Sequence, residues 1–521
     1  MASNLAPQDL ENLQLRAVRY ALAHGLLYLP PGTQAAIPMS AIHAPIALFP
    51  TPFPRAQFER AKSLQSTYNT LYARIALDTW FLDEVMGTER GVGKVDDFVG
   101  KLWTGWKALR DEGLHQVRFI VSISDLCSHM VRPLHLGLFR SDYLLHVSED
   151  NNVSIRQVEF NTISSSFGTL SQKVSEMHRH LCASTGFYES SPYLQALNLP
   201  PNNTIAGLVE GLAAAHTVYD VPSSQILFVV QPGERNVFDQ LWLEYELLEK
   251  HSIKVIRLTL DELSSCSSVS SINAPLFITP LSTRGVIPIE ISTIYFRAAY
   301  TPTDFPTPSH YTTRFTLEKS KAIKCPSIPL QLAGGKKVQQ VLTQPGVLER
   351  FLSDEAHWGL GSSSPPEVIS ELRASWMGMW GLDVGGDDGV NRAREHAMNL
   401  VLKPQREGGG NNVYKEAVPA FLDSLPLEER QAWIAMELIA PPKGMKNYLI
   451  RAGGGESLVE MEVMSELGIF GWALFGDGVG ESEGKVREKE VGWLVRTKGK
   501  DSNEGGVATG FSVLDSLVLV D

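Results

Sequence analysis

The sequence predicts an α/β protein with more than one domain. Its 521 residues can bury a large core, and a composition of 43% hydrophobic and 20% charged residues is typical of globular proteins. The clearest local pattern lies between residues 226 and 258. Apolar runs at 226–230 and 253–258 flank a stretch of helical periodicity that begins after Asn236, a candidate N-cap. This spacing predicts a βαβ unit with parallel strands.

Apolar periodicity predicts the remaining elements. Helices are expected at 8–25, 55–87, 94–113 and 415–432, and strands at 117–122, 144–147, 155–160, 292–297, 400–402, 433–439 and 491–496. The proline-rich residues 30–54 predict an extended connector, and the serines around Cys266 predict a flexible linker. Residues 352–397, which include Gly-Gly-Asp-Asp-Gly, are expected to form a variable insertion. His178 and His180 lack a third ligand nearby, so a solvated helix face is expected there.

Charge and cysteine content exclude several classes of protein. The net charge of −12 argues against a nucleic-acid-binding groove, which needs a basic excess. Prolines interrupt the uncharged run from Tyr20 to Pro54, so no membrane span is expected there. The N-terminal residues lack the basic and apolar regions of a signal peptide. Four cysteines without C-x-x-C spacing predict reduced thiols in a cytoplasmic protein.

The stretch from Asn399 to Tyr414 carries the strongest functional signal. A short apolar run ends at Lys403, and Gly408, Gly409 and Gly410 follow. Such a loop can fold its backbone N–H groups around phosphate oxygens. Arg406 adds positive charge, and Glu407 provides the carboxylate that a bound Mg²⁺ ion needs beside a phosphate. The alternative is an ordinary glycine-rich hairpin with solvated charges.

Other candidate residues lie where predicted strands end. Glu159 and Asn161 are two residues apart and therefore point to one face of a strand, where their oxygens could hold a hard cation. A polar strand edge is the alternative interpretation. Arg140 precedes the same region and could reach a phosphate or a carboxylate, and Arg297 ends another strand. Glu234, Asn236 and Gln240 follow the first strand of the βαβ unit, the usual place for a ligand.

Four segments resemble the motifs of eukaryotic-type glutathione synthetases. They are Lys-Pro-Gln-Arg-Glu-Gly-Gly-Gly-Asn-Asn at 403–412, Glu-Phe-Asn-Thr-Ile-Ser-Ser-Ser-Phe-Gly at 159–168, Ser-Glu-Leu-Gly-Ile-Phe-Gly at 465–471 and Arg-Thr-Lys at 496–498. The resemblance spans the chain from about residue 48 onwards. It implies an ATP-grasp fold, with residues 1–219 and 334–521 forming the body and a small βαβ substrate domain inserted at 220–333. Residues 403–414 and 499–510 would be lid loops.

The resemblance also assigns site residues. It implies a metal site, read as Mg²⁺, at Glu159, Asn161 and Glu407, and catalytic roles for Arg140, Lys336, Lys403 and Arg496. The implied ATP contacts are Glu159, Lys336, Lys403, Glu407, Gly408, Gly409, Gly410, Asn411, Asn412, Tyr414, Met436, Glu437, Leu438, Ile439, Glu466, Lys498 and Glu504. The implied substrate contacts are Arg140, Ser164, Ser165, Ser166, Glu234, Asn236, Gln240, Arg297, Tyr300, Arg496, Val507 and Ala508.

The implied reaction is the ATP-dependent ligation of γ-glutamylcysteine and glycine, through an acyl phosphate, in a homodimeric cytoplasmic enzyme. Ala508 fits the pattern of glycine-using relatives, whereas Thr509 departs from it, so β-alanine or serine could be weak alternative acceptors. Glu504 stands where the family has Asp. Two other classes stay open at this point: a phosphotransferase with the same ATP apparatus, and a nucleotide-binding relative without catalysis.

Overall fold

The computed structural model describes residues 5–33, 39–113, 133–186, 191–271, 274–279, 287–353, 364–383, 387–453, 458, 460–476, 486–502, 505–508 and 510–521. Thirteen of the described strands form one large sheet. In sheet order its main path runs β17 (Lys446–Ile450), β3 (Ile46–Ala47), β20 (Ser512–Asp515), β19 (Arg487–Gly499), β18 (Glu460–Phe475), β5 (His135–Val147), β12 (Ile323–Cys325), β11 (Ile289–Phe296), β10 (Leu276–Ile278) and β9 (Ser267–Val269). Three further strands join it, β6 (Val153–Asn161), β7 (Gln225–Val229) and β8 (Val255–Leu258).

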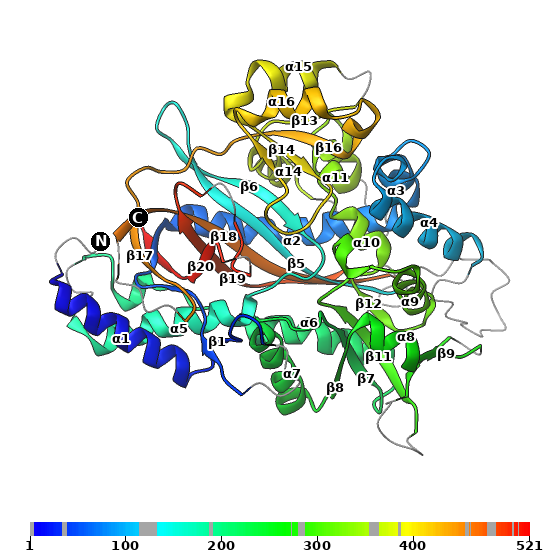
Figure 1. The fold of residues 1–521 in the computed structure, drawn as a ribbon, viewed down its shortest axis with the longest axis horizontal. Coiled ribbons are helices and arrows are strands. Elements are labelled where there is room, and N and C mark those ends of the chain that lie inside the picture. The colour runs from blue at the N-terminus through cyan, green and yellow to red at the C-terminus, as the bar shows by residue number, and fades with distance from the viewer. Residues whose placement is uncertain are drawn as a thin grey trace.

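Helices cover both faces of the large sheet (Figure 1). α2 (Arg55–Leu77) crosses one face, and α5 (Gly168–Ser184) and α6 (Thr204–Tyr219) lie along the other. Apolar side chains of α2 fill one core, which contains Tyr68 and Phe160. Those of α5 and α6 fill a second core on the other face, which contains Leu170 and Trp472. The long hairpin strands β18 and β19 are therefore buried on both faces over residues 467–475 and 491–495, where their sequence is continuously apolar.

The predicted βαβ unit is confirmed. β7 and β8 are parallel and α7 (Val237–His251) connects them. Asn236 occupies the N-cap position of α7, but its side chain makes no capping bond. β12 pairs in parallel with β5 through Lys324 and His135, so the strands of residues 220–333 continue the same sheet as the rest of the chain. The division into an inserted domain and a body stays a prediction.

A second, four-stranded sheet stands above the large one in Figure 1. Its order is β13 (Met379–Gly381), β16 (Trp433–Glu437), β14 (Leu400–Pro404) and β15 (Val413–Tyr414), and α11 (Lys336–Leu342), α15 (Asp387–Glu395) and α16 (Ala417–Ser424) pack near it. In β14, Leu400 and Leu402 point into a small core of this sheet while Val401 joins the main core. This alternation orients Lys403 to the same side as Val401.

Several sequence-based expectations are corrected. The helix expected at 55–87 is broken at Asp78, whose carboxylate accepts a bond from the Phe81 N–H at 2.9 Å and begins α3 (Thr79–Met86). Residues 352–397 supply β13, α15 and α14 (Pro366–Ala374) to the fold, and their variability among relatives stays a prediction. Cys266 is buried at the end of α8 (Leu260–Cys266) and not in a flexible linker. The expected strand at 117–122 lies outside the described residues.

Some expected bounds also shift. The helix expected at 415–432 is α16 followed by a 3₁₀ helix at Glu428–Ala432, and β16 ends at Glu437 instead of Ile439. His178 is fully buried, so the solvated helix face was wrong for that residue. Its ring bonds to the Ser516 hydroxyl and to the Ala47 carbonyl, and burial lowers the pKa of His178 to about 4. It is a structural histidine that links α5 to two strand ends.

Asp515 is a buried carboxyl in β20 that makes the stability of the folded state depend on pH. Its Oδ2 accepts bonds from the hydroxyls of Thr51 at 2.7 Å and Thr497 at 2.6 Å, yet burial raises its pKa to about 7. An unfolded Asp titrates at about 3.9, so the folded state retains a proton that the unfolded state has lost. Between about pH 4 and 7 the stability from this group falls as pH rises.

We therefore expect Asp515→Asn to remove part of the pH dependence of stability. The melting temperature of the variant should rise relative to the wild type as the pH increases from 4.5 to 7.5, because an amide cannot ionise. Thermal melts at several pH values measure this difference. A constant offset between the two proteins across that range would contradict the burial argument.

Candidate active site

Charged side chains from both sheets meet at one seam. The large sheet supplies Arg140, Asp142, Glu159, Asn161, Glu466 and Arg496, and the elements around the small sheet supply Lys336, Lys403 and Glu407. The strand register explains the first set, because Asp142 of β5 lies opposite Glu159 of β6 on one side and opposite Gly468 of β18 on the other. Residues far apart in the sequence thus converge on neighbouring strands.

Lys336 is the cation at the centre of the seam. Its Nζ lies 3.1 Å from Oε2 of Glu159 and 3.3 Å from Oε1 of Glu407, and the ammonium is almost completely buried. Burial opposes ionisation of Glu159, but Lys336 and the neighbouring cations outweigh it and lower the pKa of Glu159 to about 2. For Glu407 burial dominates and raises the pKa despite the same ammonium. Two carboxylates therefore point at one buried positive charge.

Lys403 is buried beside Lys336 and its two carboxylates, and it loses its proton more easily than an ordinary lysine. Its Nζ donates to the Val158 carbonyl at 2.9 Å, and burial lowers the pKa of Lys403 to about 8. The nearby Glu159 carboxylate acts in the opposite direction, so the lysine stays mostly protonated at neutral pH. The two amines of the seam are therefore partly balanced by the carboxylates of Glu159 and Glu407.

Arg140 and Arg496 share one carboxylate, that of Asp142. Arg140 makes a bidentate contact, with Nε 2.6 Å from Oδ1 and Nη2 2.7 Å from Oδ2. Arg496 reaches Oδ2 at 3.0 Å and also forms an ion pair with Glu466. Glu466 lies within β18, directly opposite Arg496 of β19. Burial raises the pKa of Glu466 even though Arg496 opposes that shift.

A second group of expected residues surrounds Arg297, just beyond the end of β11. Arg297 Nη2 donates to the Ser166 hydroxyl at 2.7 Å, and the carboxylate of Glu234 lies 3.7 Å away. Gln240 donates to Glu234 and accepts a bond from Arg257 at 2.6 Å. Two guanidinium atoms of Arg297, Nε and Nη1, are buried without a hydrogen-bond partner among the described residues. These two atoms could donate to a further acceptor.

The loop at residues 164–166 joins this group to the seam. Arg140 Nη1 donates to the Ser166 carbonyl at 3.2 Å, while Arg297 holds the Ser166 hydroxyl. Asp239 of α7 fixes the far side of the loop by accepting bonds from the N–H groups of Phe167 and Thr169 at 2.8 and 3.1 Å. Ser165 lies buried between them, and its hydroxyl reaches the Leu138 carbonyl at 3.3 Å. The two arginines are thus tied to one short segment.

Other expected residues lie away from the seam. The N–H groups of Glu437 and Leu438 already bond to the carbonyls of Gly378 and Asn399, and Glu437 is opposite Leu400, at the other end of the strand pair from Lys403. Asn236 is buried at the start of α7, Tyr300 lies beyond β11 and Lys498 lies in β19. Val507 is buried and Ala508 exposed, whereas Glu504 and Thr509 lie outside the described residues.

Asp142 is a site residue that sequence reasoning missed. The signal was present, since Asp142 is two residues from Arg140 and so shares its face of a strand. Nothing in the sequence alone says that a strand 354 residues later brings a second arginine to the same carboxylate. The pairing of β5 with β18 and of β18 with β19 supplies that contact.

Comparison with known proteins connects this arrangement to a family. Residues 7–519 match the family model described as eukaryotic glutathione synthase, ATP binding domain. The chain belongs to the eukaryotic glutathione synthase family. A relative named glutathione synthetase large chain, from Schizosaccharomyces pombe, is 35% identical over 98% of both chains. The glutathione synthetase of Homo sapiens is 36% identical over 98% of this chain and 97% of its own.

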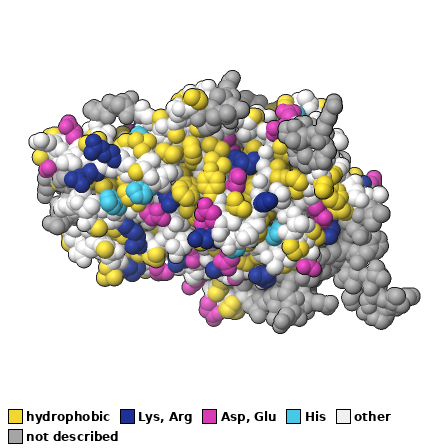
Figure 2. Space-filling model, turned by 90° about the horizontal axis from the view of Figure 1, so that it is seen from below, with side chains coloured by type: hydrophobic (Ala, Val, Ile, Leu, Met, Phe, Trp, Pro, Cys, Tyr) yellow, Lys and Arg dark blue, Asp and Glu magenta, His cyan; other side chains and the backbone are white. Residues whose placement is uncertain are grey.

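A solved structure supports the fold of this glutathione synthase family member. A glutathione synthetase-like effector from Globodera pallida, in its apo form, aligns with a TM-score of 0.72 at 22% identity, covering 99% of this chain and 98% of that one. None of the helices described here is long and apolar enough to cross a membrane. On the face seen in Figure 2, acidic, basic and hydrophobic side chains are interspersed, so the negative net charge is not gathered in one patch there.

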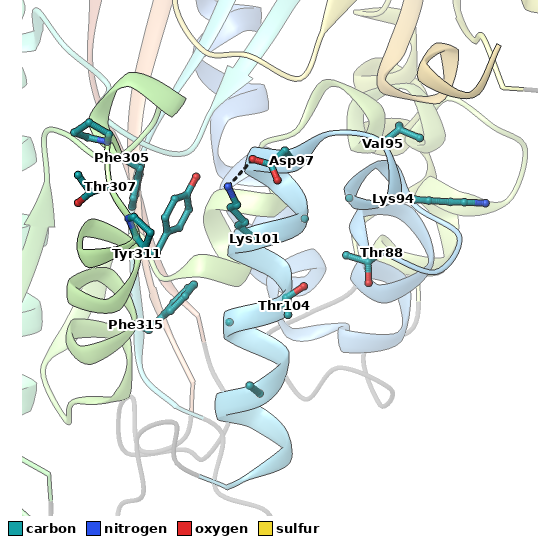
Figure 3. A pocket seen from close by; sticks show the side chains of 16 residues that line it. Thr88, Lys94, Val95, Asp97, Lys101, Thr104, Phe305, Thr307, Tyr311 and Phe315 are labelled. Atoms are coloured by element: carbon teal, nitrogen blue, oxygen red, sulfur yellow. Dashed lines mark ion pairs between the residues drawn. The ribbon is translucent and has the colours of Figure 1, made fainter. Parts of the chain in front are cut away.

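A groove of about 760 Å³ lies apart from the residues that the family resemblance assigns. It runs between α4 (Asp97–Asp111) and α9 (Pro308–Lys319). Figure 3 shows the Tyr311 and Phe315 rings facing α4 and the ion pair of Lys101 with Asp97 at its mouth, 2.7 Å long. The charges of Lys101 and Asp97 thus neutralise each other, Lys94 is the third charged residue of the lining, and none of the lining residues belongs to the seam.

The glycine-rich loop is anchored near this groove. Arg406 forms an ion pair with Asp96, a buried residue whose carboxylate also accepts a bond from the Val99 N–H at 3.0 Å and so begins α4. The start of the loop is therefore tied to the N-terminus of α4. Gly408, Gly410 and Asn411 are exposed.

We expect Asp96→Asn to loosen the loop without unfolding α4. Asparagine caps a helix about as well as aspartate, but it removes the charge that holds Arg406. A partly exposed pair is worth about 1 kcal/mol, so amide exchange at residues 405–412 should accelerate about fivefold. Hydrogen exchange by mass spectrometry measures this. The neighbouring Asp97→Asn is the control; equal acceleration in both variants would contradict the anchoring role.

Proposed function

We propose that this protein is an ATP-dependent ligase that joins γ-L-glutamyl-L-cysteine to glycine and releases glutathione, ADP and phosphate. The observation that carries the proposal is family membership over nearly the whole chain, combined with a buried seam in which amines, guanidiniums and carboxylates of five strands, helix α11 and the glycine-rich loop converge.

The seam is suited to the triphosphate of ATP. Lys336 and Lys403 provide positive charge at the root of the glycine-rich loop, whose N–H groups can approach phosphate oxygens closely. The oxygen donors of Glu159, Asn161 and Glu407 fit Mg²⁺, which prefers carboxylate and carbonyl ligands. Asn161 uses its Nδ2 to donate to Asp142 and to the Arg140 carbonyl, which leaves its amide oxygen for a cation. When bound, such an ion would withdraw charge from the γ-phosphate.

Around Arg297 the residues suit the γ-glutamyl end of the dipeptide. This end carries one carboxylate and one ammonium group. The unsatisfied Nε and Nη1 of Arg297 can bind the carboxylate, and Glu234 can accept the ammonium. Burial raises the pKa of Glu234, and a bound ammonium would favour its ionised form. Ser164, Ser165 and Ser166, with Asn236, Gln240 and Tyr300, would complete the contacts.

The chemistry then follows from the loop that connects Arg297 with Arg140. The dipeptide would extend from Arg297 along residues 164–166, which brings its cysteinyl carboxylate to Arg140. That carboxylate oxygen attacks the γ-phosphorus, ADP leaves, and Arg140 offsets the charge of the acyl phosphate. The glycine amine attacks the acyl carbon, loses a proton, and phosphate departs. Arg496, Val507 and Ala508 would hold the glycine carboxylate, and the loops at 403–414 and 499–510 would exclude water.

The remaining nucleotide contacts are proposals of the same kind. The backbone of residues 436–439 would face the adenine, and Glu466, Lys498 and Glu504 the sugar and phosphates. Because the N–H groups of Glu437 and Leu438 are already bonded, the base would have to meet other backbone atoms of this segment. We also propose a homodimer in the cytoplasm, which agrees with the free thiols of Cys182, Cys266 and Cys325.

One assay tests the proposal as a whole. The purified protein is incubated with ATP, Mg²⁺, γ-glutamylcysteine and glycine, and glutathione is detected by mass while phosphate release is measured in parallel. We expect equal amounts of glutathione and phosphate, and neither without glycine. A phosphorylated product that accumulates without free phosphate would instead indicate a phosphotransferase.

We expect Glu407→Gln to reduce turnover at least about hundredfold while leaving the melting temperature nearly unchanged. The carboxylate is one of three proposed metal ligands, and its loss empties no core. ADP formation as a function of Mg²⁺ concentration measures the effect, with the exposed Glu416→Gln as a control on the same loop side. Normal activity at ordinary Mg²⁺ concentrations would contradict the metal assignment.

For Arg297→Ala we expect weaker dipeptide binding with little change for ATP. Losing a buried, charge-assisted contact costs about 2 kcal/mol, or about thirtyfold in the dissociation constant. Calorimetric titration of the two ligands separately measures both constants. Equal losses for γ-glutamylcysteine and ATP would show that the two sites are not separate.

Glycine should remain the preferred acceptor. Ala508 fits the glycine-using pattern, and one methyl-sized difference at position 509 changes discrimination by only about 1–3 kcal/mol. Competition between glycine and β-alanine at equal concentration, read from the product masses, tests this. A dominant β-alanine product would contradict the interpretation of residues 505–510.

A further inference from the structure

We propose that Asp142 is a positioning residue that orients Arg140, Arg496 and Asn161 together, and so couples the dipeptide site to the glycine site. The inference rests on the proposed ligase function, in which those three side chains serve the acyl phosphate, the glycine carboxylate and the metal. Asp142 itself would touch none of these groups. It would act through the side chains that it holds.

Among the described residues, the side-chain hydrogen bonds of Asp142 are with these three residues. Oδ1 accepts a bond from Arg140 Nε at 2.6 Å, and Oδ2 accepts bonds from Arg140 Nη2 at 2.7 Å, Asn161 Nδ2 at 2.9 Å and Arg496 Nη2 at 3.0 Å. The carboxylate is fully buried, so water cannot replace any of the four donors. One buried anion therefore fixes two guanidiniums and one amide, and each of the three comes from a different strand.

Gly468 provides an independent sign that the fold makes room for this arrangement. It lies opposite Asp142 in the register of β5 and β18. A Cβ at this position would stand 2.8 Å from Arg140 Cδ and 2.8 Å from Asp142 Oδ1, which is closer than packed atoms tolerate. The absent side chain of Gly468 is thus what allows Arg140 to lie flat beside Asp142.

The direction of each contact explains how ligand binding would depend on Asp142. Arg140 donates from Nε and Nη2 to the Asp142 carboxylate. Its Nη1 then points to the Ser166 carbonyl, in the loop of the proposed dipeptide site. Arg496 uses Nη2 for both Asp142 and Glu466, which leaves the rest of its guanidinium for an anion. Asn161 donates from Nδ2, so its amide oxygen is turned outward. An amide at position 142 offers one acceptor oxygen instead of two to the four donor atoms, so the three side chains cannot all keep their contacts.

The test is Asp142→Asn in the full-length protein. We expect the dissociation constant of γ-glutamylcysteine, titrated without ATP or Mg²⁺, and the KM for glycine each to rise at least about tenfold, while the dissociation constant of ATP changes less than about threefold. In a variant that already carries Arg140→Ala, Asp142→Asn should raise the dissociation constant of the dipeptide by less than about threefold. Asp142 acts on the dipeptide through Arg140, and that side chain is absent in this variant. A purely structural role would lower the melting temperature without this pattern.

Asp515→Asn is the matched control, since Asp515 is an equally buried aspartate of the same sheet whose partners are hydroxyls. It should leave both ligand constants within about threefold of the wild type. Gly468→Ala is the second variant should Asp142→Asn fail to fold. It keeps the carboxylate but crowds the Arg140–Asp142 pair, and the same double loss is expected.

The proposal is overturned if Asp142→Asn, or Gly468→Ala in its place, leaves the dipeptide constant and the glycine KM near the wild-type values. It is equally overturned if Asp515→Asn causes the same double loss. These results are distinct from a failure of the proposed function, which would appear as a wild-type protein that makes no glutathione.

Discussion

Buried charge compensation at the seam is the constraint on which the rest of the structure depends. Lys336 is held by two carboxylates, and Asp142 by two guanidiniums and an amide, all nearly out of reach of water. Removing the central charge of such a group, Lys336 or Asp142, leaves its buried partners uncompensated, which is strongly destabilising in proteins generally. Through Lys336, Glu407 beside the small sheet is linked to Glu159 of the large sheet.

The long strands of the large sheet set the positions of these charges. β5 pairs with β6 on one edge and with β18 on the other, and β18 pairs with β19 over nearly its full length. A shift of one residue would turn Arg140, Asp142 and Arg496 to the opposite face. Apolar cores on both faces of the sheet fix this register, so the packing of Leu467, Phe470 and Trp493 is also what aligns the polar site.

Local sequence patterns predicted much of this, because they depend on neighbours in the chain. The βαβ unit and the glycine-rich loop follow from short-range periodicity and turn residues, and the shared face of Glu159 and Asn161 follows from their spacing. The motif resemblance predicted the family. Contacts between distant segments were not predictable in this way. The Asp142–Arg496 contact, the burial of His178 and the role of residues 352–397 in the small sheet depend on strand pairing and packing that no local pattern encodes.

The central claim is that the seam activates the cysteinyl carboxylate of the dipeptide as an acyl phosphate. The most direct measurement uses γ-glutamylcysteine labelled with ¹⁸O in that carboxylate, together with ATP, Mg²⁺ and glycine. Transfer of the γ-phosphoryl group to a labelled oxygen, followed by attack of the amine at carbon, predicts one ¹⁸O atom in each phosphate released. Phosphate without the label, formed alongside glutathione, would contradict the account.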